Sequence, residues 1–392
     1  MELQLTDAER AFRDEVRAWL EAQLSGRFAH LRGRGGPGDE HYAIEDRLEW
    51  GRVMGAAGYN CIAYPKAHGG RGATLTEEVV FNEEYVAAGG PGRIGHIGET
   101  LLGPTLIHFG DAAQQERFLP KIVSGEEIWC QGYSEPEAGS DLANLQTKAR
   151  LVGDEWVLEG QKVWTSMAPW ADWCFVLART DPDAPKHKGI SYLLVPMKQP
   201  GITIAPIEQI TGGAEFAEVF FEGAKTRKEL VVGGVNHGWK VAMGTLAFER
   251  GGSTLGQQHL FQNELDRVIA AAKRNGAGKD PVLRQRLADA AIRLKIMRLN
   301  AMRMLADQSA ELSREALISK LYWSHWHRDF GELAMDVLGA ESELAESAPY
   351  ELTAAQKAFL FARSDTIYAG SSQIQRNLIA ERGLGLPREP NR

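Results

Sequence analysis

The stretch WVLEGQKVWTS, residues 156–166, is the most informative part of the sequence for the fold. Its apolar and polar residues alternate on both sides of Gly160, as in strands with one buried face, and the glycine predicts the turn of a hairpin. Further β-rich runs follow, separated by glycine, proline and charge: GISYLLVPM (189–197), GITIAPIEQI (201–210) and AEVFFEG (217–223). We therefore expect a compact β unit in the middle of the chain.

Helical patterns flank this β unit on both sides. Near the start, Thr6 is placed to cap a helix with Glu9 as its capping-box partner. The apolar residues that follow lie on one stripe: Phe12, Val16, Trp19 and Leu20. Helical periodicity resumes near Gly238 and runs through residues 264–274, 283–308 and 315–338. The order predicts a helical domain at 1–125, a β domain at 126–236 and a helical bundle at 237–392.

A glycine- and arginine-rich segment, RGRGGPGDE at 32–40, interrupts the first helices. Its glycine spacing resembles a dinucleotide-binding fingerprint. That fingerprint requires a preceding strand, and no strand pattern precedes this segment. We interpret it as a surface loop.

Composition excludes several classes of function. The chain has 392 residues with a formal net charge of −8, and lacks the clustered cations that nucleic-acid binding requires. No apolar run is long enough to span a bilayer, so no membrane partner is expected. The three cysteines are widely spaced and the start is acidic, which favours a cytoplasmic location. His325 and His327 would point in different directions on a helix, so we predict a structural or surface role for both and no metal site.

Motifs for serine hydrolases, nucleotide-binding P-loops and zinc proteases are absent. The informative segments are GYSEPEAGSD (132–141), GQKVWTS (160–166) and IYAGSSQIQRNLIAERGLG (367–385). Together they resemble the acyl-CoA dehydrogenase family. YPKAHGGRGAT (64–74), FGDAAQQERFLPKIVSGE (109–126) and ITGGAEFAEVFF (210–221) add to this resemblance, which covers essentially the whole chain.

The resemblance implies an FAD site in the β unit. Tyr133 and Ser134 would lie against the flavin, and Gly139 would permit close approach of the backbone. Ser140 would lie near the coenzyme A moiety. The resemblance also implies that the Trp164 indole packs beside the flavin and that the Ser166 hydroxyl reaches flavin N5. Ser371 and Gln373 match further flavin-contacting positions of the family.

The position of the catalytic base departs from the commonest family pattern. Many members carry a glutamate in a Tyr-Glu-Gly segment, whereas this chain reads Tyr368-Ala369-Gly370. Ala369 has no carboxylate, but its backbone N–H is expected to bind the thioester carbonyl. In the isovaleryl and long-chain members, the glutamate lies on the first helix after the β unit and precedes an arginine. The segment GTLAFERGG therefore identifies Glu249 as the base, and Arg250 is expected to position the substrate.

Two other segments depart from the family pattern. The family's Phe-Gly, which contacts the flavin of a neighbouring subunit, is absent from residues 270–287. The later Gln-x-x-Gly-Gly segment reads DVLGA at 336–340. Because the flavin site spans a subunit interface in this family, we expect either a homotetramer or a heterotetramer with a related subunit. The sequence also resembles bacterial steroid side-chain acyl-CoA dehydrogenases, which implies a bulky acyl group.

These observations predict a multidomain α+β protein with the acyl-CoA dehydrogenase fold: N-terminal helices, a β-barrel-like middle and a C-terminal four-helix bundle. The expected reaction is FAD-dependent α,β-dehydrogenation of an acyl-CoA to the trans-2-enoyl-CoA. An electron-transfer flavoprotein is the expected electron acceptor. Two alternatives stay open: a flavin oxidase or monooxygenase on the same fold, and a non-catalytic subunit that completes a partner's site.

Overall fold

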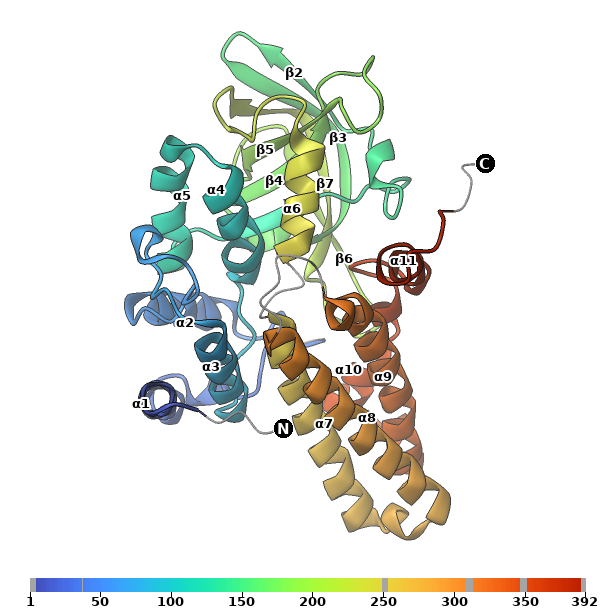
Figure 1. The fold of residues 1–392 in the computed structure, drawn as a ribbon. Coiled ribbons are helices and arrows are strands. Elements are labelled where there is room, and N and C mark those ends of the chain that lie inside the picture. Colours follow the sequence, from blue (N-terminus) through green and yellow to red (C-terminus); the bar gives the residue numbers. More distant parts are fainter. Residues whose placement is uncertain (1–4, 37, 249–252, 307–312, 346–350, 389–392) are drawn as a thin grey trace.

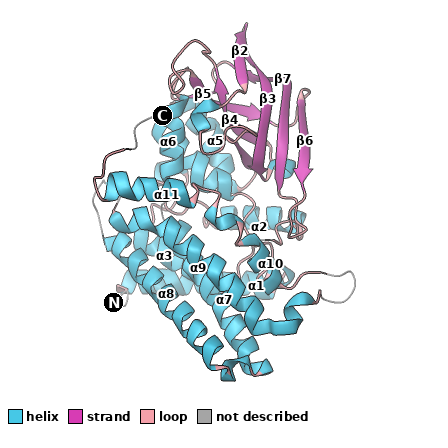
Figure 2. Cartoon of the chain, turned by 90° about the vertical axis from the view of Figure 1, so that its right-hand side faces the viewer, coloured by secondary structure: helices cyan, strands magenta, loops and turns pink. Residues whose placement is uncertain are grey.

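The computed structural model describes residues 5–36, 38–248, 253–306, 313–345 and 351–388. Helices form the N-terminal part, a sheet follows, and a bundle of long helices completes the chain (Figure 1). Seen from the side, the strands gather at one end of the molecule and the long helices at the other (Figure 2). The predicted order of helices, sheet and helices is therefore confirmed.

Helices make up the N-terminal part of the chain. They are α1 (Asp7–Ser25), α2 (Ile44–Ala56), α3 (Leu75–Ala87), α4 (Gly103–Phe109) and α5 (Ala112–Ser124). Helices α1, α2 and α3 pack around a core rich in aromatic side chains. The capping box predicted for Thr6 and Glu9 is present at the start of α1. The apolar stripe of α1 is also confirmed, because Val16 and Leu20 are fully buried and Phe12 and Trp19 pack against the same cluster.

The segment 32–40 is a loop, but it is not simply a surface loop as predicted. The guanidinium of Arg47 on α2 is buried beneath it and donates hydrogen bonds to the carbonyls of Gly35, Glu40 and Gly92. A Cβ at Gly35 would lie 2.4 Å from Arg47 Nε. The sequence of the loop gave no sign of these hydrogen bonds, because the Arg47 guanidinium that donates them comes from a helix that follows the loop in the chain.

The β unit is an eight-stranded sheet in the order β6-β7-β3-β2-β4-β5-β8, with β1 added beside β4. The strands are β1 (Trp129–Gly132), β2 (Lys148–Val152), β3 (Glu155–Ser166), β4 (Trp173–Arg179), β5 (Ile190–Pro196), β6 (Ile202–Ile207), β7 (Phe216–Arg227) and β8 (Val231–Val232). Long pairings of β3 with β7 and of β4 with β5 form its centre. Antiparallel pairing dominates. Burial alternates along much of β3 and β7, whereas β4 and β5 are buried on both faces.

The predicted hairpin at Gly160 is wrong, because β3 continues through this residue and pairs with β7 on both sides of it, with a register shift between Leu158 and Glu159. The glycine allows the backbone of β3 to lie close to Thr147 and does not form a turn. A Cβ at this position would lie 2.7 Å from the Cα of Thr147, and the backbone φ is 148°. Alternation on both sides of a glycine fits a hairpin and a glycine-containing strand equally well, so the sequence pattern alone could not separate them.

Helices also make up the C-terminal part of the chain. They are α6 (Gly238–Phe248), α7 (Ser253–Asn275), α8 (Pro281–Ala306), α9 (Arg314–Leu338), α10 (Ala354–Phe361) and α11 (Ser372–Leu378). Helices α7, α8 and α9 enclose a core rich in aromatic side chains, with Trp326 and Phe330 stacked at 5.0 Å between ring centroids. Helix α6 connects the sheet to the bundle and is joined to α4 by the hydroxyls of Thr105 and Thr245, 2.8 Å apart.

Gly160→Ala is expected to lower the free energy of unfolding by about 2 kcal/mol, because the added methyl group overpacks against the backbone at Thr147. Gly51→Ala is the matched control. Gly51 lies inside α2 with no heavy atom within 4 Å of a built Cβ, so this change should stabilise by roughly 0.5–1 kcal/mol. Urea unfolding of both variants measures the difference, and equal effects would contradict the assigned role of Gly160.

Candidate active site

A buried ion pair joins the first two sequence motifs. Lys162 on β3 places its Nζ 2.7 Å from Glu135 Oε1 and donates to the Tyr133 carbonyl at 3.0 Å. The Val163 amide donates to the Ser134 carbonyl at 2.9 Å. The loop after β1 is therefore fixed against the end of β3, so the segments GYSEPEAGSD and GQKVWTS form one structural unit.

Electrostatics make this pair sensitive to change. The side chain of Lys162 is 0% exposed and that of Glu135 is 6% exposed. Burial alone would raise the pKa of Glu135, but the Lys162 ammonium and the amides of Gln146 and Thr147 outweigh it and lower the pKa. Burial lowers the pKa of Lys162, and Glu135 opposes that shift. Removing either partner would leave an uncompensated charge in a low-dielectric interior.

The loop presents its backbone and small side chains outward. The Tyr133 ring points into the core, 5.8 Å from Phe175 and 6.2 Å from Tyr192 between ring centroids. Gly139 and Ser140 are exposed, and a Cβ built at Gly139 would meet no heavy atom within 4 Å. Of Tyr133, only the backbone can therefore face a ligand, whereas Gly139 borders open space.

A bulge at the end of β3 turns Trp164 outward. The register with β7 shifts between Lys162 and Thr165, and Trp164 adopts a left-handed φ of 57°. Its side chain is 57% exposed, with one edge-to-face contact to Phe216 at 6.1 Å. Ser166 is half-buried beside it. Bulges often re-aim side chains next to active sites, and this one leaves the indole face free to stack on a planar group.

The Tyr368-Ala369-Gly370 segment leads into α11. Ala369 is exposed and has a left-handed φ of 49°, and its carbonyl accepts a hydrogen bond from Gln375 Nε2 at 3.2 Å. Its N–H makes no hydrogen bond to the part of the chain that the structure describes. The Ser371 hydroxyl caps α11 by accepting from the Ile374 amide at 3.4 Å. The segment therefore offers an unused amide donor.

The predicted site residues fall into separate groups. Tyr133, Ser134 and the Trp164 strand end are brought together by the Lys162 pair, whereas Ala369 makes no hydrogen bond to either β segment. Gln373 is exposed on the first turn of α11. Glu249 and Arg250, predicted as base and substrate contact, lie outside the described residues, directly after α6 ends at Phe248.

Sequence reasoning missed the partners that hold these groups. Lys162 is one example. The sequence feature that could have revealed it is a lysine at a position of the alternating strand pattern that faces inward. His327 is another, because it lies buried between the carboxylates of Asp365 and Glu264. Its predicted structural role agrees with this position. The partners come from α7 and from the segment before Ala369, which no local pattern connects with α9.

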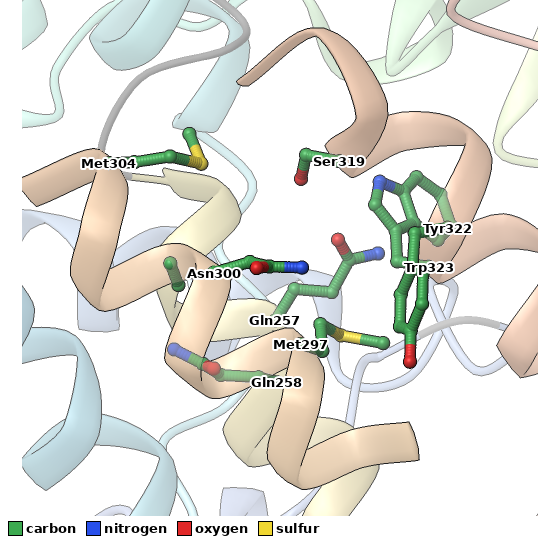
Figure 3. A pocket seen from close by; sticks show the side chains of 9 residues that line it. Gln257, Gln258, Met297, Asn300, Met304, Ser319, Tyr322 and Trp323 are labelled. Carbon is green, nitrogen blue, oxygen red and sulfur yellow. The ribbon is translucent and has the colours of Figure 1, made fainter. Parts of the chain in front are cut away.

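A pocket opens between α7, α8 and α9. Figure 3 shows its polar and aromatic lining, which includes Gln257, Asn300, Ser319 and Trp323. Of the predicted site residues, those that the structure describes do not line it. Its aromatic wall lies near the Ala369 segment, because the rings of Trp323 and Tyr368 are 6.3 Å apart.

Family models describe the same three parts of the chain. The acyl-CoA dehydrogenase N-terminal domain matches residues 6–126, the middle domain 130–224 and the C-terminal domain 236–384. The chain belongs to the acyl-CoA dehydrogenase family. The predicted family and fold are thus confirmed, and the protein is an oxidoreductase that acts on the CH–CH group of acyl-CoA.

Individual relatives share this organisation. Acyl-CoA dehydrogenase IpdE1 of Mycolicibacterium smegmatis is 53% identical over 388 residues, covering 96% of this chain and 98% of that protein. A structure described as the Tcur3481-Tcur3483 steroid ACAD has a TM-score of 0.86 at 32% identity, covering 99% of this chain and 100% of the other. The ChsE4-ChsE5 complex from Mycobacterium tuberculosis has a TM-score of 0.82 at 26% identity, covering 99% and 100% respectively.

Within the described residues, no helix has the length and hydrophobicity needed to cross a membrane. The same residues contain no cluster of three or more histidine, cysteine or acidic side chains suited to hold a metal ion.

Lys162→Met is expected to cost about 3–5 kcal/mol of unfolding free energy, because it leaves Glu135 buried without its counterion. Lys225→Met is the control, since Lys225 pairs with Glu155 at 3.0 Å on the exposed face of the sheet and should cost less than about 1 kcal/mol. Adding Glu135→Gln to Lys162→Met should recover part of the loss. Urea unfolding measures all three variants, and similar losses for both lysines would show that the buried pair has no special weight.

His327 gives a prediction about pH. Burial alone would lower its pKa, but Glu264 and Asp365 outweigh burial and raise the pKa to about 9, above the unfolded value of about 6.5. Its charged form therefore stabilises the fold fully below pH ~6.5, and this contribution declines as pH rises through ~9. The stability difference between wild type and His327→Gln should shrink by roughly 3 kcal/mol across that window. Urea unfolding between these pH values tests this, and a constant difference would contradict it.

Proposed function

We propose that this acyl-CoA dehydrogenase uses FAD to convert a bulky acyl-CoA of the steroid side-chain type to its trans-2-enoyl-CoA, with Glu249 as the base. The proposal rests on Ala369, an exposed residue whose N–H makes no hydrogen bond within the described residues. Ala369 offers a backbone N–H but no carboxylate, which fits a site in which another segment of the chain supplies the proton acceptor. The glutamate next to the end of α6 fills that role by resemblance to the isovaleryl and long-chain members.

The described residues fit a flavin. The open space beside Gly139 and the exposed Trp164 indole provide room and a stacking surface for a planar ring system. Tyr133 and Ser134 would contribute backbone groups, and the half-buried Ser166 hydroxyl would reach the ring edge. Ser371 and Gln373 would contact it from α11. When bound, the flavin supplies the acceptor for the hydride that leaves the substrate β-carbon.

The residues of the chain divide the remaining work. The Ala369 N–H donates to the thioester carbonyl and stabilises the negative charge that develops there as the α-proton leaves. Glu249 removes that proton. Ser140 and Arg250 contact the substrate, with Ser140 near its coenzyme A part. Proton removal and carbonyl binding thus come from segments that are far apart in the sequence and act on adjacent atoms of the thioester.

The steroid-type substrate is supported by relatives. A structure described as a steroid ACAD matches this chain over nearly its full length at 32% identity. The pocket between α7, α8 and α9 has polar side chains in its lining, and the ring of Trp323, which also lines it, lies 6.3 Å from the Tyr368 ring. A large acyl group with oxygen substituents would use amide and hydroxyl groups of this kind.

We also propose a related subunit as partner and an electron-transfer flavoprotein as electron acceptor. The missing Phe-Gly in residues 270–287 and the DVLGA sequence at 336–340 support a heterotetramer over a homotetramer. The names of two structural relatives, Tcur3481-Tcur3483 and ChsE4-ChsE5, each give two components. The free cysteines, of which Cys130 and Cys174 are buried, suit the reducing cytoplasm.

Anaerobic visible spectra test the proposed function. We expect the protein, alone or with its partner, to be yellow and to bleach when the matching thioester is added from a panel of short, branched, long and steroid-side-chain acyl-CoAs. Glu249→Gln should bind flavin normally but bleach at least 100-fold more slowly, because general-base catalysis contributes about 10²–10⁴. Glu116→Gln, an exposed carboxylate on α5, is the control.

The outcomes separate the alternatives. Near-normal bleaching of Glu249→Gln would exclude Glu249 as the base. Rapid oxygen consumption during turnover would favour an oxidase or monooxygenase. A protein that stays colourless even with its partner would favour a non-catalytic subunit.

A further inference from the structure

A buried histidine lies behind the segment that carries Ala369. His327 on α9 is 4% exposed, and its Nδ1 lies 2.5 Å from Asp365 Oδ2. Its Nε2 lies 3.0 Å from Glu264 Oε2 on α7. The imidazole is thus held by a carboxylate at each nitrogen, and Asp365 is 1% exposed. Such a fully bonded buried network has little freedom to rotate.

Asp365 connects the buried histidine with Tyr368, three residues further along the chain. One of its oxygens binds His327, and the other accepts the Tyr368 hydroxyl at 2.7 Å. Its backbone carbonyl accepts the Lys320 ammonium, which also lies 4.4 Å from the centre of the Tyr368 ring. The Trp323 ring, which Figure 3 shows lining the bundle pocket, packs against the same tyrosine at 6.3 Å.

The Ala369 amide belongs to the peptide unit between Tyr368 and Ala369. Tyr368 fixes one end of this unit through its side chain, and Gln375 fixes the following carbonyl at 3.2 Å. Gln375 is itself 2% exposed. The left-handed backbone of Ala369 is unfavourable for a residue with a Cβ, so it persists only where its neighbours determine it. The direction of the Ala369 N–H is therefore fixed before any ligand binds.

We propose that the buried pair of His327 and Asp365, acting through the Tyr368 hydroxyl, positions the Ala369 amide for the thioester carbonyl. His327 and Asp365 are positioning residues, because they touch neither substrate nor cofactor. The inference rests on the proposed function, in which this amide stabilises charge that appears as the α-proton leaves. An interaction that strengthens in the transition state changes the rate of the chemical step more than it changes substrate binding.

The test compares conservative variants of the purified, flavin-loaded enzyme in its native assembly. Tyr368→Phe removes only the hydroxyl, and His327→Gln removes the charge at the other end of the network. Tyr59→Phe is the matched control, since its hydroxyl donates to Glu15 at 2.8 Å in the N-terminal domain. Stopped-flow bleaching with the matching acyl-CoA, plain and α-deuterated, gives the rate of the chemical step and its isotope effect. Titration with the enoyl-CoA product gives the binding constant.

We expect Tyr368→Phe and His327→Gln each to bleach about 10-fold more slowly, because complete loss of one such donor costs about 10²–10³ in rate. The α-deuterium isotope effect should increase, and product binding should change less than about 3-fold. The double variant should be no slower than the slower single variant, since both changes act through one chain of contacts. Tyr59→Phe should behave as wild type.

Rates and isotope effects at wild-type values in well-folded Tyr368→Phe and His327→Gln would overturn the proposal, as would fully multiplicative losses in the double variant. Hydrogen–deuterium exchange of residues 364–371 provides a readout without turnover. Faster exchange is expected in His327→Gln, and unchanged exchange would count against the network. A wild-type enzyme that no thioester bleaches would contradict the proposed function, whereas active wild type with unaffected variants contradicts the positioning role alone.

Discussion

The buried contact between Lys162 and Glu135 is the interaction on which the β half of the site depends. A charged amine inside a sheet is costly to desolvate, so the sequence retains it only because a carboxylate and a carbonyl receive it there. In return, the loop after β1 cannot shift relative to the end of β3. The ion pair therefore fixes the position of the loop at Gly139, which borders open space, relative to the bulged strand end at Trp164.

Two of the exposed groups assigned to the site have a strained backbone. Trp164 and Ala369 both have left-handed backbones although neither is glycine, and each is exposed. Such conformations cost of order 1–3 kcal/mol and need a rigid environment. The β3–β7 pairing supplies it for Trp164, and the contacts of Tyr368 and Gln375 supply it for Ala369.

Sequence alone predicted the order of the domains, the first helix with its cap, and the family. Those features follow from local periodicity or from motifs of contiguous residues. Prediction failed at Gly160 and was incomplete for residues 32–40, because the deciding contacts there come from Thr147 and Arg47 elsewhere in the chain. The partners of His327 were invisible for the same reason, since they lie on other helical segments. The assigned roles of the site residues, Glu249 included, stay predictions.

A carbonyl-binding donor that belongs to the backbone has an evolutionary consequence. Substitution at position 369 changes the side chain but leaves the N–H in place, provided the backbone conformation is kept. On the proposed mechanism, a lineage that gains a second glutamate elsewhere in the chain and later loses the first passes through no form that cannot bind the thioester. On this mechanism, the base changes its position in the chain during evolution while the group that binds the thioester carbonyl stays the same.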